Sequence, residues 1–265
     1  MNNELSALVS LLDDPDPAVS AALVQRLESE AHLLDRTWLT AAARGQIPEL
    51  LTTIVLRTDA EALVDAYAVA EDLENGMWLL ARLAYPRIDH RLQGAPQLDA
   101  LAAQAAARIT AGAPADAHSV ARFLCAECGF SGNREAFDDP QNSFLPDVLE
   151  RRMGLPIVLT ALWQLVCRRL DLPCAAIALP GHVLGRWLSA AGEAHYVDLF
   201  AGGAVLTRHD LDLRAQLAGE TGAAAYLAAA SDRALLKRMA RNLAMAYLRR
   251  GDGLRATIAH ALATV

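Results

Sequence analysis

The sequence contains little of several residue types. Its 265 residues include one lysine, Lys237, four cysteines, and aromatic residues at only 5%. Because aromatic and β-branched side chains are enriched in strands, so few aromatic residues argue against an all-β sandwich. No run approaches the ~18 uncharged apolar residues of a membrane-spanning helix, and Asp13, Asp14 and Asp16 interrupt any secretory signal. We therefore expect a cytoplasmic protein without a membrane partner, whose thiols stay reduced.

What the sequence does contain favours a packed helical protein. Apolar residues make up 54% of the chain, which excludes disorder as its main state. Alanine is abundant, and it has the highest helix propensity of all residues. The length suits one large domain or two modest ones. The net charge of −7 argues against a nucleic-acid partner, because contacts to phosphates require a basic surface.

Residues 1–115 predict a purely helical leader. The segment Asp13-Asp14-Pro15-Asp16-Pro17 separates two short helices. This pair resembles one unit of a HEAT-type repeat, and generic helical packing explains it equally well. Apolar residues at helical spacing predict helices over 4–12, 18–31, 36–44, 47–57, 59–84 and 97–111.

Residues 116–221 predict a mixed core. The segment 157–171 is apolar on almost every face, so we expect a central helix that is buried on all sides. Asn142 or Ser143 is expected to cap the helix before it. Helices are expected over 117–128, 144–153 and 208–219, and strands over 174–179, 182–188 and 194–200.

Residues 222–265 predict a helical tail, with helices over 223–230, 232–250 and 254–264. Ser231 is a plausible N-cap and Gly251 a plausible stop between the last two helices. The three segments together predict a predominantly helical α+β fold with a small antiparallel sheet.

His182 and Asp198 are the candidate catalytic pair. If the hairpin is centred near Ala190, the two residues lie directly opposite each other, with Cβ atoms about 4.5–5.5 Å apart. A carboxylate at that distance can orient an imidazole and stabilise its protonated form. On spacing alone, a surface histidine and a strand-end aspartate explain the pair equally well.

Several ordered motifs resemble the SirB-type family of bacterial transglutaminase-like proteins, which implies a papain-like core followed by a tetratricopeptide-like tail. The matching stretches are Gly129–Asn133, Asp139–Ser143, Val148–Ile157, Arg168–Pro173, Pro180-Gly181-His182, Tyr196–Phe200 with Gly202-Gly203, Leu73–Gly76 with Leu79–Tyr85, Arg238–Leu243 and Tyr247–Asp252.

In the wider superfamily, the resemblance implies a cysteine at the start of the central helix and a histidine and an aspartate on the following strands. The histidine and aspartate map to His182 and Asp198, and the cysteine position maps to about Pro156–Val158. No residue there is a nucleophile, which is the main departure from an active enzyme. A helix N-terminus and a nearby imidazole would lower the pKa of a thiol at this position.

Two other side chains are candidate substitutes for the missing nucleophile. Thr160 lies near the start of the helix, but an alcohol needs an activating base, and threonine in a helix more often bonds to a carbonyl one turn earlier. Cys174 begins the next strand, at a distance from the helix start that the sequence does not fix. Cys167 is ten residues further along the helix than the expected position, which corresponds to about 15 Å.

The remaining candidates concern binding. Asn142 is expected to be a cap in preference to a ligand contact. Arg151 and Arg152 complement a helix dipole; alternatively, one of them pairs with Glu150 or Asp139 to brace the site, or meets an anionic ligand. Cys125 and Cys128 form an isolated C-x-x-C without a second ligand pair, so we expect ordinary packing and neither metal nor cofactor.

The function predicted from the sequence is protein interaction or regulation by a non-catalytic transglutaminase-like protein, with a protein or peptide partner. The alternative is a peptidase- or amidase-type hydrolase or acyl transferase that combines His182 and Asp198 with Thr160 or Cys174.

Overall fold

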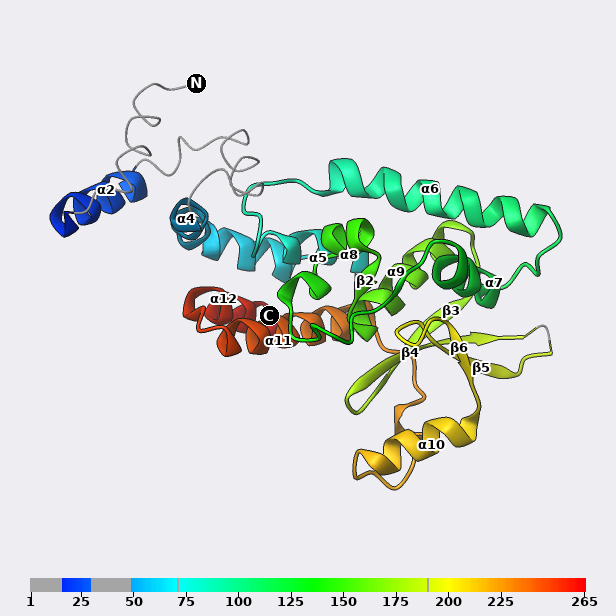
Figure 1. Ribbon diagram of the computed structural model, residues 1–265. Coiled ribbons are helices and arrows are strands. Elements are labelled where there is room, and N and C mark those ends of the chain that lie inside the picture. Colours follow the sequence, from blue (N-terminus) through cyan, green and yellow to red (C-terminus); the bar gives the residue numbers. More distant parts are fainter. Residues whose placement is uncertain (1–15, 30–48, 71, 190) are drawn as a thin grey trace.

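The computed structural model describes residues 16–29, 49–70, 72–189 and 191–265. Its fold is α+β and predominantly helical, as predicted (Figure 1). The expected helices over 4–12 and 36–44 lie outside the described residues. The described helices are α2 (Pro17–Ser29), α4 (Glu49–Ala68), α5 (Leu73–Ala81), α6 (Arg91–Thr110), α7 (Ala117–Arg122), α8 (Leu145–Arg151), α9 (Pro156–Arg169), α10 (Arg208–Leu217), α11 (Asp232–Arg249) and α12 (Gly253–Thr264).

The strands form two small sheets. A two-stranded parallel sheet joins β1 (Ser131–Gly132) to β2 (Met153–Gly154), and an antiparallel sheet has the order β3-β4-β5-β6. Its strands are β3 (Cys174–Leu179), β4 (His182–Leu188), β5 (Ala194–Asp198) and β6 (Ala204–Leu206). Single turns of other helix types are η2 (Phe123–Glu127, a π-helix), η3 (Pro140–Ser143) and η4 (Ala224–Tyr226).

Helix α9 is the centre of the fold. Pro156 occupies its first turn, where a missing amide hydrogen costs nothing, and every residue from Pro156 to Cys167 is buried. The helix packs against β3 and β4 on one side and against α6, α7 and α8 on others. The prediction of a central helix buried on all sides is confirmed.

The antiparallel sheet is covered on both faces, with α9 above it and α10 below it in Figure 1. Val183 points to the large core around α9, whereas Leu184 and Tyr196 belong to a smaller cluster between the sheet and α10. Gly185 allows the sheet to approach α9 closely, because a Cβ atom there would lie 2.6 Å from the ring of Trp163.

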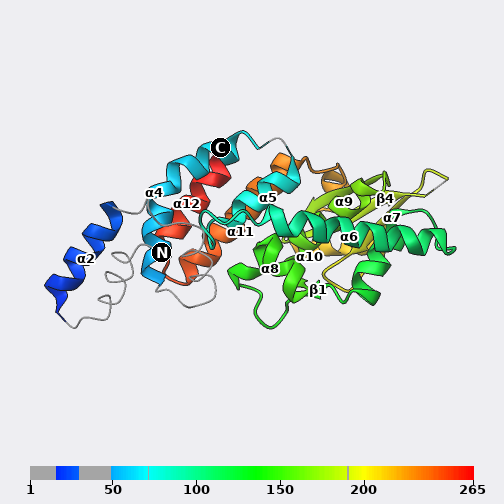
Figure 2. The ribbon, with the colours of Figure 1, turned by 90° about the horizontal axis from the view of Figure 1, so that it is seen from above.

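The predicted leader and tail pack together. Helices α4 and α5 contact α12 and α11, and the four helices gather on the side of the molecule away from the antiparallel sheet (Figure 2). One hydrophobic cluster includes Leu56 of α4, Leu159 of α9 and Leu262 of α12. The three predicted segments, 1–115, 116–221 and 222–265, therefore share a continuous core. Their division into separate domains stays a prediction.

Several predicted helices differ from the structure. The break predicted between residues 57 and 59 does not occur, because α4 runs through it, and the helix predicted over 59–84 is instead divided between the end of α4 at Ala68 and α5 at Leu73–Ala81. Helix α6 begins at Arg91, earlier than predicted, with Pro96 accommodated in its second turn. The helix expected over 223–230 is only the 3₁₀ turn η4. None of the described helices has the length and apolar character to cross a bilayer.

Candidate functional site

A pocket of about 240 Å³ lies where the first turn of α9 meets the start of β4. Pro156 and Ile157 form one wall, and His182 forms another. Helix α11 contributes a third wall. The other lining residues are Phe137, Asp138, Asp139, Ser143, Leu155, Gly181, Val183, Arg238, Asn242, Met245, Ala246 and Arg249. The imidazole is thus brought to the amino end of the central helix.

Asp198 contacts the imidazole of His182. The Nε2 atom of His182 lies 3.0 Å from Oδ2 of Asp198, at an angle that falls short of a well-aligned hydrogen bond. The same carboxylate oxygen lies 3.0 Å from Nη1 of Arg214 on α10. Its other oxygen accepts a hydrogen bond of 3.1 Å from the amide of Ala201. The predicted pair is therefore close in space, and Arg214 is a third member.

The predicted register of the hairpin is wrong by two positions. Val197 pairs with Gly185, which places Leu184 and not His182 opposite Asp198. His182 and Asp198 therefore contact each other diagonally across the two strands. Their side chains still lie on the same face of the sheet, because the observed register differs from the predicted one by an even number of residues. That face also carries Leu184 and Tyr196, which α10 covers, and this explains why Arg214 reaches the carboxylate.

The electrostatic environment keeps Asp198 ionised. Only 2% of its side chain is exposed, and burial alone would raise the pKa of the carboxyl. The contact with His182, the charge of Arg214 and the amide of Ala201 outweigh burial, so the pKa of Asp198 lies below its ordinary value. An ionised carboxylate here can orient the imidazole and stabilise its charged form.

The start of α9 carries no nucleophile. Pro156 and Ile157 line the pocket, and Val158 is fully buried. The amide of Leu155, the N-cap residue, donates to the main-chain carbonyl of Asn142 at 3.0 Å. This hydrogen bond ties the helix start to η3.

The structure does not bring Thr160 or Cys174 to the imidazole. Thr160 is fully buried, and its hydroxyl is 3.5 Å from the carbonyl of Val183, to which it donates. Cys174 pairs with Trp187 at the far end of β3, whereas His182 pairs with Leu179. Cys174 and Leu179 are five residues apart on β3, so Cys174 lies about 16 Å along the strand from the residue that pairs with His182.

The four cysteines are free. Burial, together with the charge of Asp198, raises the pKa of Cys125 to about 12, and its Sγ lies 3.9 Å from the carbonyl oxygen of Leu199. Within the described ranges, no three histidine, cysteine, aspartate or glutamate side chains gather in a way that could hold a metal ion.

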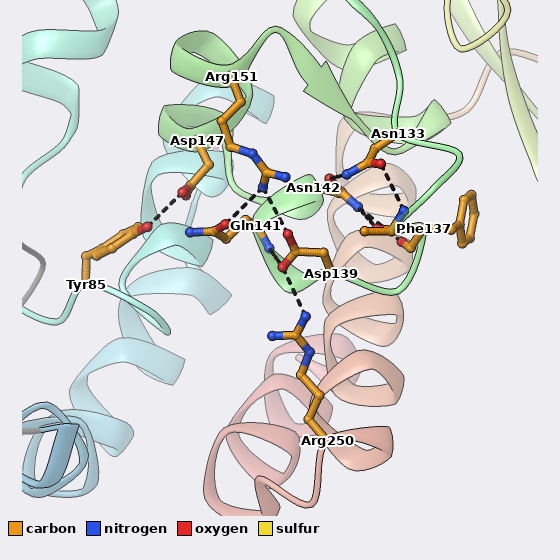
Figure 3. Close-up of polar contacts among 10 residues, drawn as sticks. Tyr85, Asn133, Phe137, Asp139, Gln141, Asn142, Asp147, Arg151 and Arg250 are labelled. Carbon is orange, nitrogen blue, oxygen red and sulfur yellow. Dashed lines mark hydrogen bonds and ion pairs between the residues drawn. The ribbon is translucent and has the colours of Figure 1, made fainter. Parts of the chain in front are cut away.

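Asn142 is an internal brace, and the prediction that it or Ser143 caps α8 is wrong, since Phe144 is the N-cap residue. Its side chain is completely buried. The amide nitrogen donates to the carbonyls of Ala136 and Phe137, and its oxygen accepts from Asn133 (Figure 3). All of these partners belong to the loop before η3.

The two arginines at the end of α8 have different surroundings. Arg151 forms an ion pair with Asp139 at 3.1 Å and a hydrogen bond to Gln141, and Asp139 also meets Arg250 of the tail (Figure 3). Arg152 has a left-handed backbone (φ 58°) and lies 4.6 Å above the ring of Phe130. Neither side chain lines the His182 pocket.

Sequence reasoning missed three side chains around the imidazole. Arg214 pairs with Asp198, the ring of Phe200 lies 6.1 Å from that of His182, and Ser143 lines the pocket. The aromatic residue follows Asp198 by two positions, so it could have been found on the same strand edge. Arg214 and Ser143 gave no local signal, because each reaches the site only through tertiary packing.

These features define a papain-like arrangement in which a helix start, a histidine and an aspartate meet, without a thiol. The family model of the transglutaminase-like superfamily matches residues 93–241, which is more than half of the chain. The chain therefore belongs to the transglutaminase-like superfamily.

Curated relatives occur in bacteria and in mammals. A UPF0162 protein of Xylella fastidiosa (strain Temecula1) is 38% identical over 135 residues, which cover 49% of this chain and 48% of that protein. A UPF0162 protein of Vibrio cholerae is 36% identical over 107 residues, 40% of this chain and 38% of that protein. F-box only protein 21 of Mus musculus is 32% identical over 121 residues, 43% of this chain and 19% of that protein. The chain thus spans about half the length of the first bacterial relative, and no solved structure matches it.

Proposed function

We propose that the chain is a SirB-type transglutaminase-like protein that binds an extended peptide segment of a protein partner in the His182 pocket and leaves it covalently unchanged. The observation that carries the proposal is which residues form the walls of this pocket. His182 and Asp198 are in contact there, but Pro156 and Ile157 occupy the helix start. Without a thiol, the covalent acyl intermediate of the superfamily cannot form at that position. The retained site then serves interaction or regulation.

The surroundings of the pocket support a peptide ligand. A neighbouring depression shares Gly181, Arg238, Asn242 and Met245 with it, so a groove continues along α11 towards Tyr226. Exposed apolar side chains flank this groove, with Phe137 47% and Met245 50% exposed. Concave sites with apolar walls and a few convergent polar groups are typical of ligand-binding sites.

The proposal includes the organisation of the chain. A helical leader over 1–115 and a tetratricopeptide-like tail over 222–265 would hold the core over 116–221 and supply one side of the groove through α11. A cytoplasmic location is part of the same proposal, and the four free thiols are compatible with it.

One experiment tests the absence of acyl transfer. The chain and its His182→Ala variant are incubated with a dansyl-labelled primary amine and casein as the glutamine-bearing protein. We expect no dansyl incorporation above the level without the chain, and no difference between the two proteins. Robust labelling or deamidation that His182→Ala abolishes would overturn the non-catalytic proposal.

A second experiment tests binding directly. Random twelve-residue peptides displayed on phage are selected on the folded chain, and the enriched peptides are titrated by fluorescence anisotropy. Met245→Glu introduces a charge at the edge of the groove and should weaken binding at least tenfold. Leu217→Glu is the matched control, because Leu217 is exposed on α10 outside the groove. Failure to enrich any peptide, or equal affinity for both variants, would contradict the proposal.

Ser143 favours a second candidate, a hydrolase or acyl transferase with a serine nucleophile. Its side chain is 3% exposed and lines the same pocket as His182. In this mechanism Oγ would attack a carbonyl carbon while His182 accepts its proton and passes it to the leaving amine.

A fluorophosphonate probe separates the two candidates. Labelling of Ser143, located by mass spectrometry and lost in both Ser143→Ala and His182→Ala, would favour the hydrolase. Thr160→Ser is a suitable control, because its hydroxyl is committed to the carbonyl of Val183. The absence of labelling would remove the support for a serine nucleophile.

A further inference from the structure

A second pocket, of about 710 Å³, lies between α8 and the segment that leads into α6. It has no lining residue in common with the His182 pocket. One wall comes from Tyr85, Ile88, Asp89, His90, Gln93, Gly94 and Gln97, and the other from Pro146, Asp147, Leu149, Glu150 and Arg152.

This pocket concentrates buried polar atoms that have no hydrogen-bond partner. Seven such side-chain atoms occur in the described part of the chain, and three of them belong to residues that line this one pocket: His90 Nε2, Asp147 Oδ2 and Arg152 Nη1. Leaving a buried polar group unpaired costs about 1–3 kcal/mol. Three in one pocket therefore indicate groups that await a partner from outside the chain.

Two of these groups carry opposite charges and yet do not pair with each other. Asp147 is 7% exposed, and its Oδ1 accepts a hydrogen bond of 2.8 Å from the hydroxyl of Tyr85, which fixes the carboxylate (Figure 3). Arg152 takes part in no ion pair among the described residues, and its guanidinium rests on Phe130. Its neighbour Arg151, in contrast, is paired with Asp139.

We propose that this pocket binds a free α-amino acid, whose ammonium group meets Asp147 and whose carboxylate meets Arg152. A simple anion would satisfy Arg152 and leave Asp147 unpaired, and a simple cation would do the reverse. Only a ligand that carries both charges serves both side chains. Because Asp147 Oδ2 and Arg152 Nη1 are buried, a small rotation of each side chain accompanies binding.

The rest of the wall would contact the side chain of the amino acid. Gln93 and Gln97 offer uncharged hydrogen-bonding groups, and Ile88 and Leu149 offer apolar contacts. Asp89 and Glu150 also line the pocket and repel an acidic side chain, so this wall suits an amino acid whose side chain carries no negative charge.

Isothermal titration calorimetry of the whole chain with each of the twenty free amino acids tests the proposal. We expect at least one uncharged amino acid to bind with a Kd below about 1 mM. Asp147→Asn and Arg152→Gln should each weaken that binding at least tenfold. Arg134→Gln is the control and should bind as the wild type does, because Arg134 lies over the ring of Phe200 and outside the pocket.

The N-acetyl derivative of the bound amino acid gives a second readout. It should bind the wild type at least tenfold more weakly, and Asp147→Asn should weaken its binding no further. The absence of binding by all twenty amino acids at about 5 mM, or unchanged affinity in both pocket variants, would overturn the proposal. His182→Ala should leave the affinity unchanged, so this test fails or succeeds independently of the proposed peptide site.

Discussion

Arg214 places its guanidinium Nη1 3.0 Å from Oδ2 of Asp198, a carboxylate that is 2% exposed. The arginine belongs to α10, on the outer face of the sheet, whereas the imidazole of His182 reaches the same oxygen from β4. A buried carboxylate between a guanidinium and an imidazole is held ionised and in one orientation. The sheet edge that carries the candidate site is thereby joined to the helix that covers it.

The first prediction concerns the dependence of stability on pH at Asp198. Its pKa in the folded protein is below that of the unfolded chain, so its ionisation stabilises the fold above the unfolded pKa of about 4. This contribution is lost as the pH falls through the lower, folded pKa. We expect Asp198→Asn to reduce the free energy of unfolding by about 1–3 kcal/mol at pH 7.

Urea unfolding of the wild type and Asp198→Asn from pH 7 to pH 3 measures this difference. The gap between the two proteins should narrow below about pH 4. Asp65→Asn, on the exposed face of α4, is the control and should differ little from the wild type at any of these pH values. A gap that stays constant across this pH range would contradict the assigned ionisation of Asp198.

The second prediction concerns Asp147, whose ionisation should destabilise the fold, whereas that of Asp198 stabilises it. Burial raises the pKa of Asp147 to about 6, a shift that the hydrogen bond from Tyr85 only partly opposes. Ionisation of Asp147 therefore favours the unfolded chain, and its destabilising effect appears as the pH rises from about 4 through 6. We expect Asp147→Asn to raise the free energy of unfolding at pH 7.5 by roughly 1–2 kcal/mol.

The measurement is again urea unfolding, at pH 7.5 and at pH 4. At pH 4 most of the difference should be lost, since Asp147 is then protonated in the folded protein and about half protonated in the unfolded chain. A variant that is less stable than the wild type at pH 7.5 would show that the ionised carboxylate has a partner in the folded protein.

Local signals were sufficient for the central elements of the fold. The apolar character of 157–171 on every face predicted the buried helix α9, and β3 has the predicted bounds Cys174–Leu179. Ser231 caps α11 as predicted, by accepting from the amide of Ala234. In each case the determining residues are neighbours in the sequence.

Where the decisive contact is distant in sequence, prediction was incomplete. The predicted boundary between the helices over 47–57 and 59–84 lies inside α4, where Asp59 pairs with Arg87, and the actual boundary is at Asp72, whose side chain caps α5. The hairpin register depends on a turn without a specific sequence signal. Ser143 shares a pocket with His182 only because η3 packs against α11, whose Arg238 donates to the carbonyl of His182.

The third prediction concerns Gly185. A methyl group there would lie 2.6 Å from a ring carbon of Trp163 and 2.8 Å from a methyl carbon of Val197, so Gly185→Ala must displace packed side chains. Overpacking of this kind costs about 1–3 kcal/mol. Gly253→Ala is the matched control, because nothing lies within 4 Å of its added methyl group at the start of α12.

Thermal and urea unfolding of the two alanine variants check this expectation. Gly253→Ala should be neutral or more stable by up to about 1 kcal/mol, since alanine restricts the unfolded chain. Equal stability of Gly185→Ala and the wild type would mean that the sheet can move away from α9 at little cost.

The last prediction concerns the buried indole of Trp163. Its Nε1 donates a hydrogen bond of 2.7 Å to the carbonyl of Ala117, which ties α9 to the first turn of α7. Trp163→Phe removes this hydrogen bond and opens a cavity in a fully buried position, so we expect a loss of about 2 kcal/mol or more in the free energy of unfolding. Trp187→Phe removes the same atoms from a ring that stacks on His118, without a hydrogen bond from its indole, and should cost less. Urea unfolding of both variants measures the difference, and a smaller loss for Trp163→Phe than for Trp187→Phe would show that the hydrogen bond to Ala117 contributes little to holding α7 against α9.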